Sequence, residues 1–186
     1  MNREALRALV AEGGAKAAEK LGEATGEKWV IESVALSVED DAVFEPLLAG
    51  IAKDHYGSHF SIPGAGIVVM FPGKSGYLVS TAFTRDHQDQ VESMDKRELK
   101  SLAEIANIFL NPLIGHLAAA WRRTVILSAP KMEVASQRDL VTAALARFQD
   151  KEKLAASLLI KLSSPNLFSQ CAVAIFLDSS LADLAG

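Results

Sequence analysis

The hydrophobic positions of the first 84 residues predict a helix, a strand, a second helix and two further strands. Residues 3–22 place apolar side chains at helical spacing, and residues 28–38 are rich in β-branched side chains, which is typical of a strand. Residues 38–54 start with acidic side chains and continue with helical spacing, so we expect a second helix there. Two strands are expected at residues 59–71 and 76–83, joined by the turn sequence PGKSG.

The same order of elements returns after a polar connection at residues 84–96. We expect a long helix, a strand, a shorter helix and two final strands, at residues 97–121, 123–130, 136–149, 153–162 and 167–178. Corresponding elements of the two halves lie about 95 residues apart, which indicates an internal duplication. The prediction is therefore a single α/β domain over residues 1–186. In it, two pseudo-twofold halves, about 1–84 and about 93–186, share one central sheet with two long helices on one face.

Composition and charge narrow the class of protein. The chain has 186 residues, of which 49% are hydrophobic, and a formal net charge of -4, so no basic surface for nucleic acid is expected. The single cysteine, Cys171, lies in a strand-like segment and is typical of a protein kept in a reducing compartment, so we expect a cytoplasmic location. The most apolar core stretch, GIVVMF, is too short to cross a bilayer, and we expect no membrane contact.

The long helix expected at residues 97–121 carries a polar stripe on one side. At about 100° per residue, Lys100, Glu104, Asn107 and Asn111 fall within roughly 60° of one another. Either this stripe docks a partner, or it is the solvated face of an amphipathic helix in which Lys100 and Glu104 form a surface ion pair. The apolar stripe, which must face the sheet, consists of Leu99, Leu102, Ala106, Phe109, Leu110, Leu113 and Leu117.

The residues around the polar stripe favour a role beyond solubility. Asparagine is a weak helix former because its amide competes for backbone hydrogen bonds, so Asn107 and Asn111 reduce the stability of the helix. Ile108 and Ile114 flank them, and we expect both to be exposed or half-exposed. Pro112 cannot donate a backbone hydrogen bond, so a kink is expected just beyond the two asparagines.

The segment LAEIANI resembles the active-site helix of the chemotaxis phosphatases of the CheC, CheX and FliY type. The signature of that family is an acid or serine, three residues, Glu, two residues, Asn, about twenty-two residues and Pro. Glu104, Asn107 and Pro130 match this signature, with twenty-two residues between the last two, whereas Lys100 stands where the family has an acid or a serine. The first half has no Glu/Asn pair at the equivalent positions, so the resemblance implies a CheC-like fold with a single site.

The resemblance also implies a function: hydrolysis of the phosphoaspartate on a CheY-like response regulator in chemotaxis or two-component signalling. Asn107 would orient the attacking water and Glu104 would grip a lysine of the regulator, while Lys100, Ile108 and Asn111 would shape the contact. The protein would need no cofactor of its own, because the Mg²⁺ of such a reaction is held by the phosphorylated partner. The alternative is a catalytically silent module of the same fold that binds a receiver domain or a CheD-like protein. The sequence leaves open whether the chain forms a homodimer.

Overall fold

The computed structural model describes residues 2–38, 44–45, 55–84, 94–148 and 154–183. The elements of the first half are α1 (Arg3–Thr25), β1 (Val30–Val38), β2 (His55–Ile62), β3 (Ala65–Pro72) and α3 (Gly73–Thr84). Those of the second half are α4 (Met94–Ala120), β4 (Lys131–Ala135), α5 (Gln137–Arg147), β5 (Leu154–Ser164), β6 (Ser169–Asp178) and α6 (Ser179–Ala182). The helix expected at residues 38–54 and the connection expected at 84–96 lie mostly outside the described residues.

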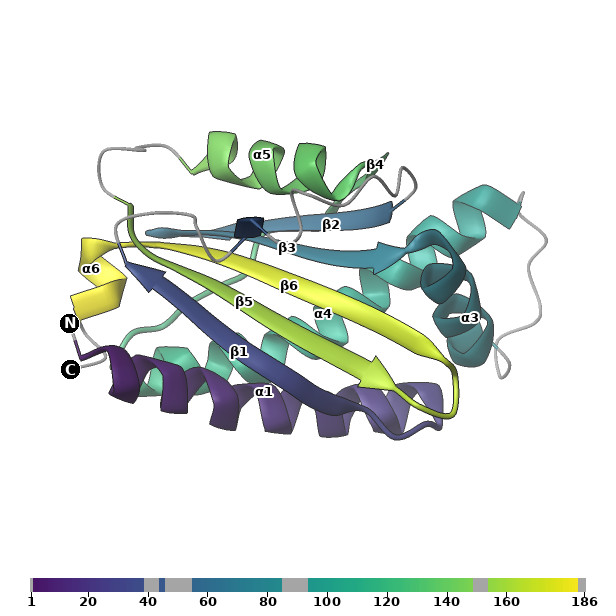
Figure 1. The fold of residues 1–186 in the computed structure, drawn as a ribbon, viewed down its shortest axis with the longest axis horizontal. Helices are drawn as coiled ribbons and strands as arrows, with labels where there is room; N and C mark the ends of the chain where they lie inside the picture. Colours follow the sequence, from purple (N-terminus) through teal and green to yellow (C-terminus); the bar gives the residue numbers. More distant parts are fainter. Residues whose placement is uncertain (1, 39–43, 46–54, 85–93, 149–153, 184–186) are drawn as a thin grey trace.

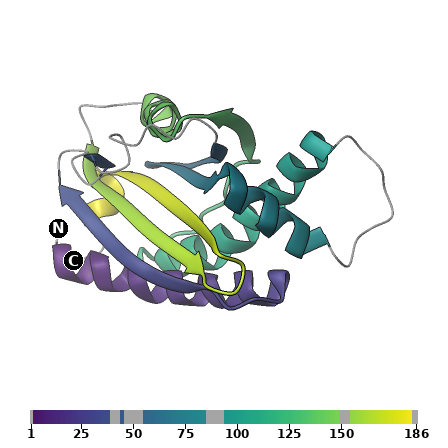
Figure 2. The same cartoon turned by 45° about the vertical axis from the view of Figure 1, so that its right-hand side comes forward.

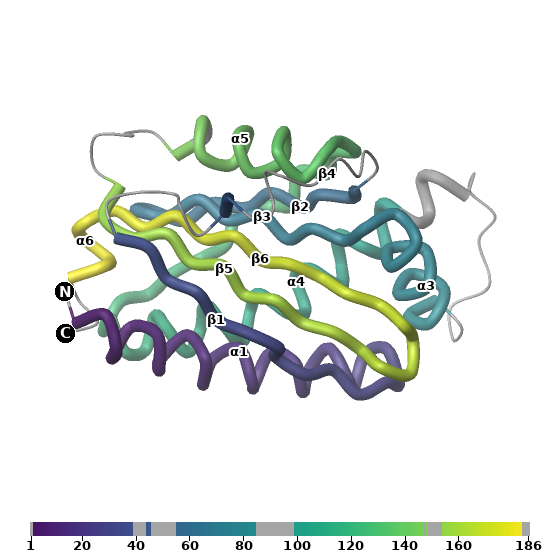
Figure 3. Tube along the Cα trace, viewed as in Figure 1, coloured from purple at the N-terminus to yellow at the C-terminus, as the bar shows by residue number. Residues whose placement is uncertain are grey.

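All strands of the described chain join one six-stranded antiparallel sheet, in the order β1-β5-β6-β3-β2-β4. The order is symmetric, because exchanging β1 with β4, β2 with β5 and β3 with β6 gives the same order read from the other edge. Figure 3 shows that β5, a strand of the second half, lies between β1 of the first half and β6 of the second half. The predicted α/β fold with pseudo-twofold layout is therefore confirmed. The boundaries of the halves near residues 84 and 93 stay a prediction.

The helices divide between the two faces of the sheet (Figure 1). Helices α1 and α4 pack against each other on one face, as predicted for the two long helices, and α5 covers β2 and β3 on the other face. Figure 2 shows α3 beside the first turns of α4. The larger core cluster lies between the sheet and α1 and α4, and a smaller one lies under α5, where the rings of Phe44 and Phe176 are 5.1 Å apart. Helix α4 is therefore held on one side by the main core and is open on the other.

Helix α4 is long and apolar enough, by length and composition alone, to cross a bilayer over Leu99–Ala120. Half of that stretch is buried inside the protein. The core helix of a soluble protein meets the same criteria, so the composition of α4 is explained by its place beneath the sheet.

Two segments of the first half differ from the sequence prediction. Residues 59–71 contain a hairpin rather than one strand, because Gly64 adopts a φ of 85°, which favours glycine and allows the chain to turn between β2 and β3. Residues 76–83, predicted as a strand, form helix α3. The buried residues of α3 recur at helical spacing, and this period outweighs the β-branched composition of the segment: they are Ser75, Gly76, Val79, Ser80 and Ala82.

One predicted strand of the second half is displaced. Residues 123–130 follow Arg122, which has a φ of 53°, and form no regular strand, although the Ser128 N–H donates to the Ser61 carbonyl over 3.0 Å. The strand is β4, five residues that pair with β2 immediately afterwards. Ile126 is 80% exposed, so the apolar run VIL that suggested a strand at 123–130 does not belong to the core throughout.

Candidate functional site on helix α4

The buried side of α4 matches the apolar stripe expected from the sequence. Leu102, Ala106, Phe109, Leu110, Leu113 and Leu117 are all buried, and Leu99 is half-buried. Ile114, predicted to be at least half-exposed, is only 3% exposed. Ile114 is buried because α4 contacts α1, α3, β2 and β4 as well as covering the core. The apolar side of the helix is therefore wider than its own periodicity indicates.

The five residues predicted to form the site lie together on the outward side of α4. Lys100, Glu104 and Asn111 are exposed, and Asn107 and Ile108 are half-buried between them and the apolar side. No ion pair joins Lys100 to Glu104, and neither side chain hydrogen-bonds to another residue in the described part of the chain. A lysine placed before a glutamate is the weaker arrangement of this pair in a helix, which agrees with the lack of contact between Lys100 and Glu104.

The two asparagines of the stripe are joined by a hydrogen bond. The Asn111 side-chain N–H donates to Asn107 Oδ1 over 3.2 Å, across one turn of the helix. An amide oxygen has two lone pairs and an amide nitrogen two hydrogens, so Asn107 keeps one acceptor position and both donors for a ligand. The sequence spacing allowed this contact but did not specify it, because the side-chain rotamers decide it.

Pro112 lies inside α4, and the helix continues past it to Ala120. Since proline has no N–H, the carbonyl of Ile108 receives no hydrogen bond from the position four residues later. A backbone acceptor therefore adjoins the asparagine pair. Pro130, the last anchor of the resemblance, is exposed and directly precedes β4, so it does not end a strand as the sequence suggested.

Helix α1 carries a different arrangement at the corresponding place. Lys16 Nζ lies 2.9 Å from His116 Nδ1, and Glu12 Oε2 lies 3.4 Å from His116 Nε2, so both α1 side chains are directed at α4. Gly13 allows this approach, because a Cβ there would lie 3.0 Å from Leu113 Cδ1 and 3.2 Å from His116 Cδ2. Glu12 and Lys16 thus bring a carboxylate and an ammonium group of α1 to the His116 ring of α4. Sequence reasoning had not connected His116 with α1, because the contact is purely tertiary.

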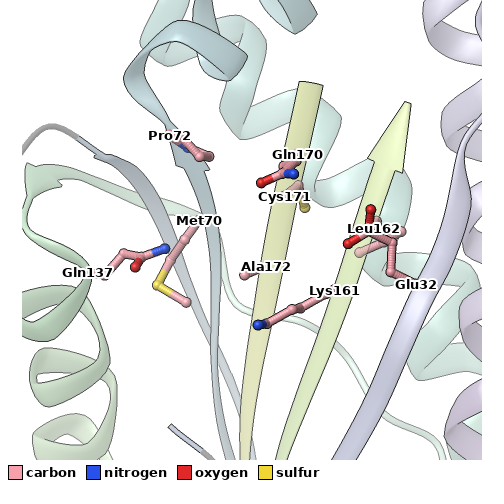
Figure 4. A pocket seen from close by; sticks show the side chains of 9 residues that line it. All are labelled: Glu32, Met70, Pro72, Gln137, Lys161, Leu162, Gln170, Cys171 and Ala172. Atoms are coloured by element: carbon pink, nitrogen blue, oxygen red, sulfur yellow. The ribbon is translucent and has the colours of Figure 1, made fainter. Parts of the chain in front are cut away.

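A small hollow of about 110 Å³ opens on the side of the sheet that carries α5 (Figure 4). Lys161 extends its ammonium group over β6, and the Gln137 amide at the start of α5 points toward Met70. Cys171 also lines this hollow but is 3% exposed, and burial raises the pKa of its thiol well above the usual range. The sequence signal for this hollow is Lys161, which directly follows the apolar run LLI of the strand.

Comparison with known proteins gives a consistent answer for the fold. No family sequence model and no curated protein sequence matches the chain. Among solved structures, Thermotoga maritima FliY superposes with a TM-score of 0.67 at 14% identity, covering 100% of this chain and 95% of that one. The FliM middle domain from H. pylori gives 0.65 at 11% identity, with coverage of 100% and 98%. CheX from Desulfovibrio desulfuricans gives 0.59 at 11% identity, with coverage of 91% and 99%.

The chain has the fold shared by FliY, FliM and CheX. The resemblance inferred from the sequence is thereby confirmed at the level of the fold, over essentially the whole chain. CheX is named as a chemotaxis protein, and FliM structures with this fold were solved in complexes with FliG and with SpeE. The outward side of α4 carries the exposed Glu104 and Asn111, with the half-buried Asn107 between them in the sequence.

Proposed function

We propose that this protein is a phosphatase that removes the phosphoryl group from the aspartate of a CheY-like receiver domain. The observation that carries the proposal is the exposed Glu104 one turn before Asn107, whose amide is held by Asn111. The fold, which the chain shares with CheX and FliY, supports the same reading. The reaction would be part of chemotaxis or another two-component pathway in the cytoplasm.

Asn107 would position the attacking water. Hydrolysis of an aspartyl phosphate transfers the phosphoryl group to water, so the protein's main task is to place a water in line with the bond that breaks. An amide suits this task because it accepts and donates hydrogen bonds without titrating. The Mg²⁺ held by the phosphorylated partner would neutralise the developing charge, so this chain need supply no metal of its own.

Glu104 would hold the partner in register. Its carboxylate is exposed and has no hydrogen bond or ion pair within the described part of the chain, so it can receive a lysine from the receiver. Lys100 and Ile108 flank it on the same side of α4 and would shape the contact.

A second candidate function is binding without catalysis. Lys100 favours this alternative, because a positive charge one turn before Glu104 opposes the approach of a partner lysine. The FliG and SpeE complexes of FliM likewise illustrate this fold in protein assembly. The bound protein would then be a receiver domain or a CheD-like protein.

Loss of activity in Asn107→Ala is the first prediction. The wild-type chain should speed the decay of phosphate from at least one Mg²⁺-loaded, phosphorylated receiver, and the variant should abolish this acceleration because no group then orients the water. The measurement is the release of phosphate under single-turnover conditions. Asn166→Ala is the matched control, since Asn166 is an exposed asparagine in the turn between β5 and β6 and should leave the rate unchanged.

The results separate the two functions. Acceleration that depends on Asn107 establishes the phosphatase and identifies its receiver. Binding of a receiver without any acceleration, with the wild-type and the variant alike, would replace the phosphatase by the silent binder.

A further inference from the structure

We infer that Asn111 is a positioning residue, which holds the Asn107 amide in the one orientation that suits the attack of water. The inference rests on the phosphatase function proposed above and adds a specific role for a residue four positions away. Its basis is the hydrogen bond from the Asn111 side-chain N–H to Asn107 Oδ1, 3.2 Å long, on the exposed side of α4.

The direction of this hydrogen bond gives the site a polarity. Because Asn111 donates, Asn107 Oδ1 is turned toward the C-terminal end of α4, and Asn107 Nδ2 is turned away from it. The second lone pair of Oδ1 can then accept a hydrogen of the attacking water, and the Nδ2 hydrogens can be donated to a phosphoryl oxygen. The opposite orientation would direct Oδ1, which carries a partial negative charge, at the negatively charged phosphoryl group, and the two would repel each other.

The bond adds little to the stability of the helix, since exposed side-chain pairs of this kind contribute weakly. No other residue in the described part of the chain hydrogen-bonds to the Asn107 side chain. Its neighbours at positions 103, 106, 108 and 110 are apolar, and Glu104, one turn earlier, has no hydrogen bond to it. Among the residues that the structure describes, Asn111 alone therefore distinguishes the two ends of the Asn107 amide.

Three substitutions of Asn111 test whether the orientation of the Asn107 amide, and not just a contact with residue 111, determines the rate. Asn111→Ala removes the donor, so the Asn107 amide samples both orientations. Asn111→Gln keeps an amide that can still donate. Asn111→Asp leaves only acceptors, which draw Asn107 Nδ2 toward position 111 and hold the amide in the wrong orientation. Gly115→Asp is the control for charge, because Gly115 is exposed one turn further along α4 and a Cβ there has nothing within 4 Å.

The experiment measures kcat and KM of the full chain on the phosphorylated, Mg²⁺-loaded receiver that the wild-type protein dephosphorylates. We expect Asn111→Ala to lower kcat about fivefold and Asn111→Asp about thirtyfold, with smaller changes in KM, because the loss is one of alignment. Asn111→Gln should keep more than about half of the wild-type kcat. Gly115→Asp should leave kcat unchanged.

Failure of the inference is distinct from failure of the proposed function. If the wild-type chain accelerates decay through Asn107 while Asn111→Ala and Asn111→Asp keep the wild-type kcat, the phosphatase stands and the positioning role is wrong. If Gly115→Asp lowers kcat as much as Asn111→Asp, charge rather than orientation explains the loss, and the inference is again overturned. Absence of acceleration by the wild-type chain on every receiver refutes the phosphatase itself.

Discussion

At the scale of single residues, Lys100 is the position where this chain departs most from the pattern it resembles. The ammonium group is exposed one turn before Glu104 and pairs with neither Glu104 nor any other described residue. A partner lysine opposite Glu104 would be attracted by Glu104 and repelled by Lys100. Lys100 therefore affects which charges a partner can present to this side of α4.

Replacing Lys100 by serine should strengthen binding of such a receiver. We expect Lys100→Ser to lower the Kd about threefold at low ionic strength, because one repulsive charge is removed, and the gain should shrink in high salt. Titration calorimetry at two salt concentrations measures this. Lys74→Ser, which removes an exposed lysine on α3, is the control for net charge. Weaker binding by Lys100→Ser would mean that the partner presents an acid opposite Lys100.

The thiol of Cys171 should be inert in the folded protein. Burial raises its pKa, so almost no thiolate is present at pH 8, and the side chain is 3% exposed. A disulfide reagent should therefore modify Cys171 only as fast as the protein unfolds, and in denaturant at the same pH the reaction should be immediate. Rapid modification without denaturant would show that the Cys171 thiol becomes exposed to solvent in the folded protein.

The sequence was sufficient to predict the outward position of Glu104 and Asn107, because the helical period alone determines which side of α4 faces away from the core. It was insufficient for the two contacts that define their surroundings. The Asn111–Asn107 bond depends on rotamers, and the link from Glu12 and Lys16 to His116 depends on how α1 and α4 meet.

At the scale of elements, the errors of sequence reasoning each have a physical origin. Residues 76–83 are rich in strand-forming residues but form α3, and residues 123–130 look like a strand but pair only irregularly. In α3 the helical spacing of the buried residues outweighs strand propensity, and in residues 123–130 the apolar run lies largely outside the core, with Ile126 80% exposed. The long elements α1, α4, β5 and β6 were predicted well, since their apolar periods extend over several turns or pairs.

The packing of α1 on α4 should depend on Gly13. Gly13→Val should lower the free energy of unfolding by about 2 kcal/mol, because the added side chain would press on Leu113 and His116. Gly115→Ala is the matched substitution in open space and should raise it by about 0.5–1 kcal/mol through helix propensity. Urea unfolding followed by circular dichroism measures both. An unchanged stability in Gly13→Val would show that the two helices separate at little cost.

At the scale of the whole molecule, the halves exchange their outer strands. β1 belongs to the first half but pairs with β5, and β4 belongs to the second half but pairs with β2. The duplication could be read from the sequence, because the order of elements repeats, but the exchange could not. Strand neighbours depend on the packing of the complete chain.

Neither half should therefore fold alone. Separate fragments covering residues 1–84 and 94–186 should each lack cooperative unfolding, because β1 and β4 would lose the strands they pair with. Mixed at equal concentrations, the fragments should regain the circular dichroism and thermal transition of the intact chain. A cooperative transition in either fragment by itself would contradict the dependence of each half on the other.

The exchange of outer strands also bears on how the protein acquires its structure during synthesis. Val34 pairs with Ile160, so β1 leaves the ribosome more than a hundred residues before β5, with which it pairs. Contacts so distant along the chain form slowly, because the entropy of closing a long loop is lost before the contacts stabilise the structure. Until then the backbone N–H and C=O groups of β1 are hydrogen-bonded to water instead of a neighbouring strand, and they can pair with other chains. The nascent first half therefore exposes an unpaired strand edge until β5 has been made and has paired with β1.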